Sequence, residues 1–251
     1  MMRSWRFLLV GVCATALLAL PGCGSRDGST RLATGDRAAE HRDTAAPQLG
    51  PSRADGRPRI VAHGDSLTAG LGLAPDQAYP VLLQQRLDAE GLNYEVVNAG
   101  VSGDTSAGGL SRLDWALDGD VRVIVVALGG NDALRGLPIE ELRLNLSQII
   151  ERAQARGVTV ILAGMEAPSN FGRSYIVAFH QVYPELAKKY GVAFVPFLLE
   201  GVAGVEALNQ RDGIHPTATG ARMVADNVWA VLRPLVKGHP RARSREKAPG
   251  S

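Results

Sequence analysis

The sequence predicts a single α/β domain in which helices cover both faces of a parallel sheet. Between residues 58 and 236, short runs rich in Val and Ile alternate about five times with segments of helical periodicity. These runs mostly lack polar alternation, which is typical of strands buried on both faces. The chain has 251 residues, of which 45% are hydrophobic and 21% charged. This composition excludes a collagen-like, wholly disordered or disulfide-built protein.

The expected strands carry the apolar runs. They span residues 59–63, 94–98, 121–128, 158–164 and 193–196. In open α/β sheets, ligands bind beyond the carboxyl ends of the strands. The residues that follow each strand are therefore the first candidates for function.

Helical patterns follow the strands. They span residues 77–90, a shorter piece around 105–117, and then 139–156, 173–190 and 219–235. In the third of these, Leu142, Leu146 and Ile150 recur at helical spacing, and Gly157 suits a helix C-terminus. Strand followed by helix, repeated along the chain, favours a parallel sheet.

Residues 1–22 have the layout of a secretory signal peptide. Arg3 and Arg6 precede an apolar run of 14 residues, Phe7 to Leu20, which is shorter than the roughly 20 residues of a membrane span. The run ends in Leu20-Pro21-Gly22-Cys23, which resembles a bacterial lipobox and predicts lipidation at Cys23. We expect a lipoprotein on the periplasmic side of a bacterial membrane, the outer membrane in a Gram-negative host. The alternative is an ordinary cleaved signal and a soluble periplasmic protein.

Two segments flank the expected domain. Residues 23–57 have almost no large apolar side chains, which predicts a flexible tether. Residues 237–251 carry five basic residues against one acidic and are expected to form a disordered basic tail, either solvated or in contact with anionic headgroups. Residues 58–236 carry 14 Arg and Lys against 19 Asp and Glu. A nucleic-acid partner is therefore not expected, despite the net charge of +2 for the whole chain.

A serine follows the first expected strand, in Gly64-Asp65-Ser66-Leu67-Thr68. A hydroxyl at this place stands at the end of the sheet, where the N–H groups of the next helix can bind an oxyanion. The segment is not the G-x-S-x-G elbow, because the residue two after Ser66 is Thr68. The alternative is that Ser66 only caps a helix.

Two further loops contain possible hydrogen-bond donors. Residues 98–105 follow the second strand, and Gly100 and Gly103 allow the backbone to approach a ligand closely. Gly129-Gly130-Asn131-Asp132 follows the third strand, and the Asn131 amide can donate to a developing oxyanion. Each loop also fits a structural role, as a helix cap or a turn closed by its own side chains.

A carboxylate and a histidine precede the last expected helix, in Asp212-Gly213-Ile214-His215-Pro216. An Asp three residues before a His can orient the imidazole while the other ring nitrogen takes a proton from a hydroxyl. An ordinary Asp-Gly surface turn is the alternative. His63 is the competing histidine, and we interpret it as structural or as lining the edge of the site.

The four loops resemble the SGNH (GDSL-type) hydrolases. The Gly-Asp-Ser-Leu block, the glycine loop, the Asn of Gly-Gly-Asn-Asp and the Asp-x-x-His block occur in family order across residues 58–236. Longer matches at 102–106, 129–136 and 212–216 are similar to the bacterial arylesterase, acyl-CoA thioesterase and lysophospholipase branch. The resemblance implies a three-layer α/β/α, flavodoxin-like domain with a five-stranded parallel sheet, the SGNH hydrolase fold.

The resemblance also implies a serine hydrolase that acts on ester and thioester bonds. Ser66 would be the nucleophile, His215 the general base and then acid, and Asp212 the carboxylate that orients His215. The N–H groups of Ser66 and Gly103 and the Asn131 amide would form the oxyanion hole. An acyl-enzyme would form and water would resolve it. No metal, cofactor or required protein partner is expected.

The expected substrate-binding residues are Asp65, Leu134, Leu137, Pro168 and Ile214. The resemblance places segment 133–138 as a mobile loop beside the acyl pocket, and segment 165–171 would form the opposite wall. Medium-to-long acyl esters and thioesters are the expected small-molecule substrates, with lysophospholipids included. Two alternatives stay open: a carbohydrate O-acetyl esterase that acts on cell-envelope glycans, and a non-catalytic envelope lipoprotein.

Overall fold

The structure is a computed structural model that describes residues 56–238. Its strands are β1 (Arg59–Gly64), β2 (Glu95–Gly100), β3 (Val121–Ala127), β4 (Thr159–Ala163) and β5 (Ala193–Val195). All pairs are parallel, in the order β2-β1-β3-β4-β5. The direction of winding reverses between β1 and β3, and ligands bind in open α/β sheets at such a switch point. The parallel five-stranded sheet predicted from the sequence is confirmed.

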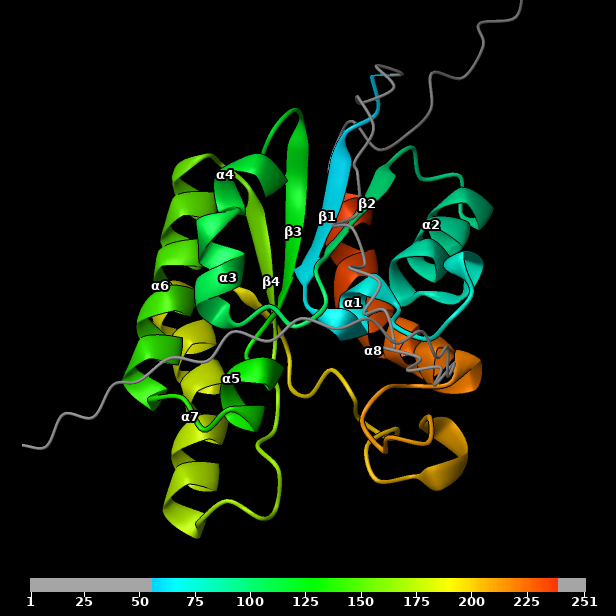
Figure 1. The fold of residues 1–251 in the computed structure, drawn as a ribbon. Helices are drawn as coiled ribbons and strands as arrows, with labels where there is room; N and C mark the ends of the chain where they lie inside the picture. The colour runs from blue at the N-terminus through cyan, green and yellow to red at the C-terminus, as the bar shows by residue number, and fades with distance from the viewer. Residues whose placement is uncertain (1–55, 239–251) are drawn as a thin grey trace, which may run out of the picture. The chain divides into compact units, whose positions relative to one another are not determined.

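Helices cover both faces of this sheet (Figure 1). One layer contains α2 (Tyr79–Ala89) and α8 (Ala218–Gly238), and the other contains α3 (Ser106–Ser111), α6 (Ile139–Ala155) and α7 (Arg173–Tyr190). Shorter elements are α1 (Ser66–Ala69), η1 (Pro75–Gln77), α4 (Leu113–Ala116), α5 (Gly130–Leu134) and η2 (Glu206–Leu208). The short helices α1 and α5 begin where β1 and β3 end, so both lie at the switch point (Figure 1).

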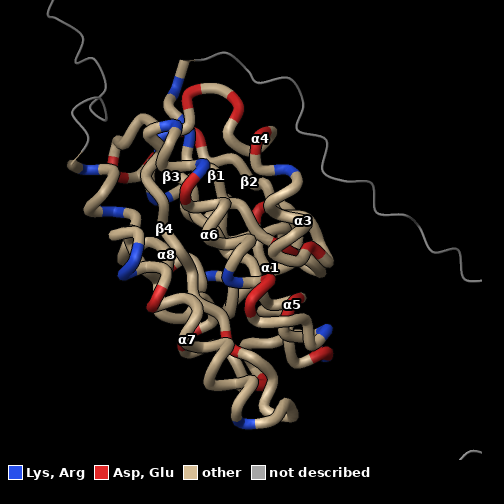
Figure 2. Tube along the Cα trace, turned by 90° about the vertical axis from the view of Figure 1, so that its left-hand side faces the viewer, with Lys and Arg blue, Asp and Glu red and all other residues tan. Residues whose placement is uncertain are grey.

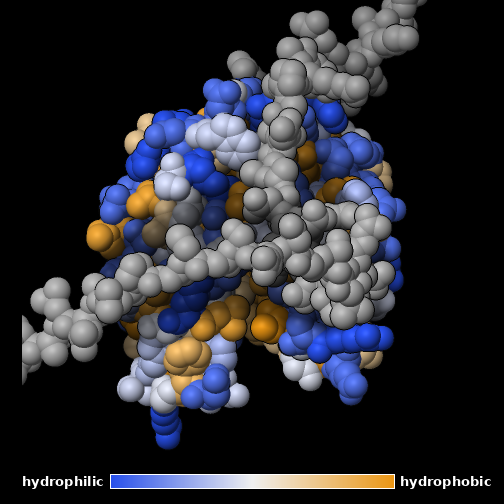
Figure 3. Space-filling view, in the orientation of Figure 1, coloured by the Kyte–Doolittle hydropathy of each residue, from blue (hydrophilic) through white to orange (hydrophobic). Residues whose placement is uncertain are grey.

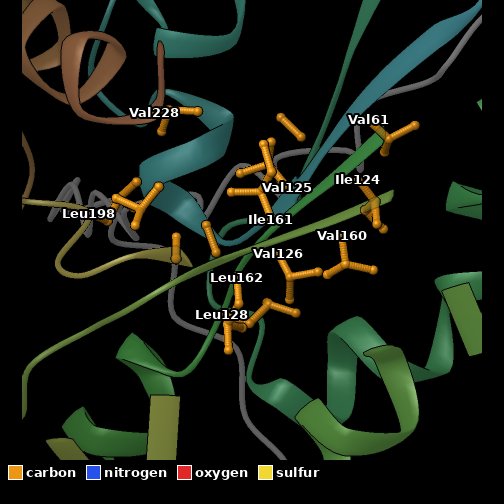
Figure 4. Packing of buried hydrophobic residues seen from close by; sticks show 14 of the residues in the cluster. Val61, Ile124, Val125, Val126, Leu128, Val160, Ile161, Leu162, Leu198 and Val228 are labelled. Atoms are coloured by element: carbon orange, nitrogen blue, oxygen red, sulfur yellow. The ribbon is translucent and has the colours of Figure 1, made fainter. Parts of the chain in front are cut away.

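The core explains why the strands lack polar alternation. Successive side chains of a strand point to opposite faces, and helices bury both faces here. On β3, Val125 and Val126 are both fully buried. Figure 4 shows Val126 with Leu162 on one side of the sheet, away from Val228 of α8 on the other. Apolar residues are therefore needed at consecutive positions of the strand.

Two expected helices are each divided. The expected helix 77–90 becomes η1 and α2, because Ala78 is extended and Pro80 lies in the first turn of α2. A proline fits a first helical turn but cannot donate the hydrogen bond that would continue a helix from earlier residues. The expected helix 105–117 is divided at Arg112 into α3 and α4.

Two expected boundaries differ from the structure. Part of the segment expected as a loop, 133–138, lies in the helical turn α5, which begins after Gly129 at φ 113°. The basic tail does not begin at Lys237, because α8 continues to Gly238. Lys237 Nζ lies 2.8 Å from Glu90 Oε2 at the end of α2, and this ion pair extends the fold into the last turn of α8.

Several expectations fall outside the described residues. These are the signal peptide, Cys23, most of the tether and residues 239–251. Within residues 56–238, no helix combines the length and the apolar character that crossing a bilayer requires.

Gly100 tests how closely the end of β2 packs against α1. A Cβ at this position would lie 2.2 Å from Ala69 N and 2.7 Å from the carbonyl carbon of Thr68, both of which are backbone atoms. We expect Gly100→Ala to lower the free energy of unfolding by about 3 kcal/mol, at the upper end of overpacking costs. The control is Gly238→Ala, since nothing lies within 4 Å of its added methyl. Urea unfolding followed by circular dichroism measures both, and equal midpoints would contradict the close packing.

Candidate active site

Ser66, His215 and Asp212 form a chain of hydrogen bonds. Ser66 Oγ lies 2.9 Å from His215 Nε2, and His215 Nδ1 lies 2.7 Å from Asp212 Oδ2. Ser66 is the first residue of α1, and the other two residues lie in the loop before α8. The structure therefore brings the predicted nucleophile, base and orienting carboxylate together from two distant parts of the chain.

Local backbone geometry holds Asp212 in its charged form. Its Oδ1 accepts hydrogen bonds from the backbone N–H groups of Ile214, at 2.9 Å, and His215, at 3.0 Å. These bonds, first that of the His215 N–H, lower the pKa of Asp212 to about 2. The carboxylate side chain is 45% exposed, so its charge depends on these donors and not on burial. An ionised Asp212 can stabilise a protonated His215 imidazole.

Asp65 lies behind the serine and joins two elements. Its Oδ1 accepts from the Leu67 N–H at 3.0 Å and so caps α1, while its Oδ2 accepts from Asn131 Nδ2 at 3.1 Å. Asp65 is 2% exposed, and burial raises its pKa to about 6. The carboxyl group lines the cavity beside Ser66, but both of its oxygens already bind groups of the protein.

Two of the three expected oxyanion donors, the Asn131 amide and the Ser66 N–H, belong to residues that line the cavity beside Ser66. Asn131 follows β3, and one of its amide N–H groups is taken by Asp65, while the other has no partner among the described residues. Ser66 supplies its own N–H at the start of α1. Gly103 lies in the loop after β2 at φ 85° and is not a lining residue, and its carbonyl accepts from Arg135 Nη2 at 2.7 Å.

Asp132 joins the loops that follow β2 and β3. It is 2% exposed, and its two oxygens accept from the N–H and the Oγ of Ser106, at 2.8 and 2.5 Å. Asn145 Nδ2 of α6 donates to the same Oγ at 3.0 Å. From the sequence, Asp132 is expected at most to close the turn after the third strand. The signal of a further role is a second polar side chain after Asn131 at the end of a buried strand.

A cavity of about 550 Å³ opens beside the serine. Among its lining residues are Ser66, Asn131, His215 and the apolar Leu134, Met165, Pro168, Phe197, Leu199 and Ile214. The expected substrate-binding residues Asp65, Leu134, Pro168 and Ile214 thus meet at one cavity, whereas Leu137 does not line it. Figure 3 shows a notch between two lobes at this end of the molecule, with hydrophobic residues along its inner edge. The size is within the usual range of small-molecule sites.

Charged side chains of both signs lie around the switch point, where Arg112 and Arg135 bind backbone carbonyls at the ends of β1 and β2 and in the loop after β2. Figure 2 shows acidic positions beside α1 and α5, and Asp65 and Asp132 are the buried carboxylates of this region. Glu166 lines the cavity, and its Oε1 lies 2.6 Å from His180 Nδ1. Within residues 56–238, no group of three or more His, Cys, Asp or Glu is placed to hold a metal ion.

His63 is a structural residue of the fold. It is fully buried, with Nε2 3.0 Å from the Gly109 carbonyl oxygen and Nδ1 3.1 Å from Arg112 Nη1. Burial first, and then the charge of Arg112, lower its pKa to about 3. The ring is therefore neutral, donates from Nε2 to Gly109 and accepts at Nδ1 from Arg112. It does not line the cavity beside Ser66.

Comparison with known proteins gives consistent results. The GDSL-like lipase/acylhydrolase family matches residues 62–223. The chain is 47% identical over 178 residues to esterase TesA of Pseudomonas aeruginosa, which covers 70% of this chain and 89% of that protein. It is 38% identical over 185 residues to thioesterase 1/protease 1/lysophospholipase L1 of Escherichia coli, covering 73% and 88%. A crystal structure of TesA superposes with a TM-score of 0.68 at 46% identity, covering 70% and 99%.

The buried, neutral His63 predicts a loss of stability in acid. An unfolded His has a pKa near 6.5, so between that value and about 3 the unfolded chain binds the additional proton and stability falls with pH. From pH 7 to pH 5 the expected loss from this group is about 2 kcal/mol. Asp65 has the opposite effect on stability. Its pKa is higher in the folded than in the unfolded protein, so the folded protein binds its proton first and stability rises as the pH falls through about 6.

The measurement compares urea unfolding of the wild type and His63→Asn at pH 7 and pH 5. Asn keeps one donor and one acceptor but does not titrate in this range. The contribution of Asp65 is common to both proteins and cancels in the difference. Stability should fall less in the variant, by about 2 kcal/mol. The same fall in both proteins would mean that His63 is not held neutral.

Proposed function

The chain belongs to the GDSL-like lipase/acylhydrolase family, whose members hydrolyse esters, and we propose that it cleaves carboxylic esters and thioesters through an acyl-enzyme on Ser66. One observation carries this proposal. The hydrogen-bonded chain of Ser66, His215 and Asp212 ends at a cavity of about 550 Å³ with mostly apolar walls. A nucleophile with its base thus faces a space that can hold an acyl group.

The first step forms the acyl-enzyme. His215 Nε2 removes the proton from Ser66 Oγ, and Oγ attacks the acyl carbonyl carbon, whose π electrons move to the oxygen. The imidazolium is stabilised by the ionised Asp212 at Nδ1. When the tetrahedral intermediate breaks down, Nε2 returns the proton to the leaving alcohol or thiol.

The oxyanion is bound by donors that are already oriented. The free N–H of the Asn131 amide is directed by the bond from its other N–H to Asp65. The Ser66 N–H lies at the capped start of α1, and we assign the third donor to the Gly103 N–H. Removing one such donor typically costs about 10²–10³ in kcat. Water, deprotonated by His215, then attacks the acyl-enzyme, which releases a carboxylic acid and restores Ser66.

The cavity walls favour medium-to-long acyl chains. Leu134, Met165 and Phe197 are large apolar side chains, and such walls bind a hydrocarbon chain better than a polar glycan. The names of the relatives, esterase and thioesterase/lysophospholipase, support esters and thioesters as the substrate class. Lysophospholipids have such an acyl ester and are included in the proposal.

We also propose that the enzyme is exported and held at a bacterial membrane by lipidation of Cys23. Sequence alone supports this: a positive start, an apolar run and the lipobox-like Leu20-Pro21-Gly22-Cys23. These residues lie outside the described part of the chain. An anchor on the periplasmic side would place the ester-cleaving domain near lipid substrates.

The test of the proposed chemistry is hydrolysis of p-nitrophenyl esters from acetyl to palmitoyl. Ser66→Ala should lower kcat by at least about 10³-fold with little change in Tm, because it removes the nucleophile and only a single hydroxyl. Ser174→Ala, at an exposed position of α7, is the matched control and should keep full activity. The wild-type rate should rise from acetyl to medium or long chains.

Two outcomes would contradict this proposal. Substantial activity of Ser66→Ala would remove Ser66 as the nucleophile. Serine-dependent activity confined to the acetyl ester would instead indicate an O-acetyl esterase.

Membrane anchoring has a separate test. Cys23→Ser should move the protein from the membrane fraction to the soluble periplasmic fraction, because the acyl chains are attached to this thiol. Cys13→Ser changes a cysteine inside the apolar run and should leave the protein in the membrane fraction. Retention of Cys23→Ser with the membranes would contradict the lipid anchor.

A further inference from the structure

We propose that Arg112 is a positioning residue, which fixes the loop 101–104 and its Gly103 donor against the turn that carries Ser66. The proposal rests on the proposed function, because the donor acts on the oxyanion of that reaction. Arg112 lies at the junction of α3 and α4, and its side chain is 16% exposed. No motif in the sequence predicts a role for Arg112.

The guanidinium binds the ends of both strands that precede these segments. Arg112 Nη2 donates to the Gly64 carbonyl at 2.7 Å, two residues before Ser66. Arg112 Nη1 donates to the Ala99 carbonyl in β2 at 2.6 Å. The Val101 N–H also donates to the Gly64 carbonyl, at 3.0 Å. One carbonyl at the end of β1 thus binds both the start of the loop and the arginine.

The same guanidinium binds the far end of the loop. Arg112 Nε lies 2.6 Å from Asp104 Oδ2, and the two side chains are only 16% and 19% exposed. Asp104 directly follows Gly103 in the sequence. Hydrogen bonds between charged groups are stronger than neutral ones, and more so when partly removed from water. Arg112 therefore holds the loop at the residue next to the donor.

The neutral His63 completes the site around Arg112. Its Nδ1 lies 3.1 Å from Arg112 Nη1, and an uncharged ring can accept that hydrogen bond. All three guanidinium nitrogens are thus engaged with four different acceptors. A lysine carries the charge but has one nitrogen and no planar fork, so it cannot replace these bonds together.

This arrangement predicts a specific kinetic signature. None of Arg112, Asp104, His63 and Gly64 lines the cavity beside Ser66, so loss of the guanidinium leaves the walls that bind the acyl chain unchanged. It instead allows the Gly103 donor to shift relative to Ser66. An interaction made mainly in the transition state affects kcat and leaves KM nearly unchanged.

The experiment measures kcat and KM of the full chain with a medium-chain p-nitrophenyl ester. Arg112→Gln should lower kcat by about 10²-fold and Arg112→Lys by about tenfold, with KM within about twofold of the wild type. Arg152→Gln is the matched control, since Arg152 forms an exposed ion pair with Asp114. Its kcat should stay within about twofold. An unchanged kcat in both Arg112 variants would overturn the proposal.

A second comparison separates positioning from general stability. Val228→Ala removes buried side-chain volume on α8, and it should lower the unfolding midpoint without changing kcat of the folded enzyme. If the Arg112 variants lost activity only in proportion to the unfolded fraction, as Val228→Ala would, Arg112 would be merely structural.

A transition-state analogue tests the oxyanion hole directly. Ser66 Oγ adds to the carbonyl carbon of an alkyl trifluoromethyl ketone while His215 Nε2 takes the Oγ proton, and the C=O π electrons move to the oxygen, which becomes the oxyanion. Its inhibition constant should rise in the Arg112 variants by the factor by which kcat/KM falls, as it should in Asn131→Ala. Unchanged inhibition with reduced kcat would overturn the proposal. Residual activity of Ser66→Ala would instead mark failure of the proposed function, whatever the Arg112 variants do.

Discussion

The hydrogen bond from Asn131 Nδ2 to Asp65 Oδ2 joins the ends of β1 and β3, and the rest of the site depends on it. The order of the sheet makes this bond possible, because β1 and β3 are neighbours at the switch point. The same carboxylate caps α1 and so sets the position of the Ser66 N–H. The buried Asp65 carboxylate thus positions both the Asn131 amide and the Ser66 N–H relative to the Ser66 hydroxyl.

Two aspartates of the site have opposite electrostatic environments. Burial raises the pKa of Asp65 to about 6, whereas backbone donors lower the pKa of the exposed Asp212 to about 2. Both are ionised at neutral pH, and each binds the group it orients: the Asn131 amide for Asp65, the His215 imidazole for Asp212. Below about pH 6 only Asp212 keeps its charge, so the two supports of the site differ in their sensitivity to acid.

The sequence predicts best what depends on local pattern. Consecutive apolar residues predict the strands because both faces of the sheet are buried. Asp212 and His215 lie three residues apart, a spacing that already allows their contact. Ser66 is predicted from its place after a strand and from the family motif, since its partner His215 lies 149 residues away. The division of the expected helix 105–117 and the helical turn α5 depend on tertiary packing. Arg112 and Asp132 could not be found, because no motif assigns them these roles and neither residue type signals burial. Leu137, expected from its place in a motif, does not line the cavity.

The arrangement separates binding of the substrate from stabilisation of the transition state. Most of the apolar walls come from segments after β3, β4 and β5, whose apolar side chains make none of the hydrogen bonds that hold Asp65 and Asn131. The hydrogen-bonded groups behind Ser66 are instead packed against backbone and glycines. At Gly64, for example, an added Cβ would lie only 2.7 Å from the Ala127 carbonyl oxygen, so a side chain does not fit there. Chain-length preference can therefore vary through the walls while the oxyanion geometry is kept, since the latter is fixed by backbone packing that tolerates little change.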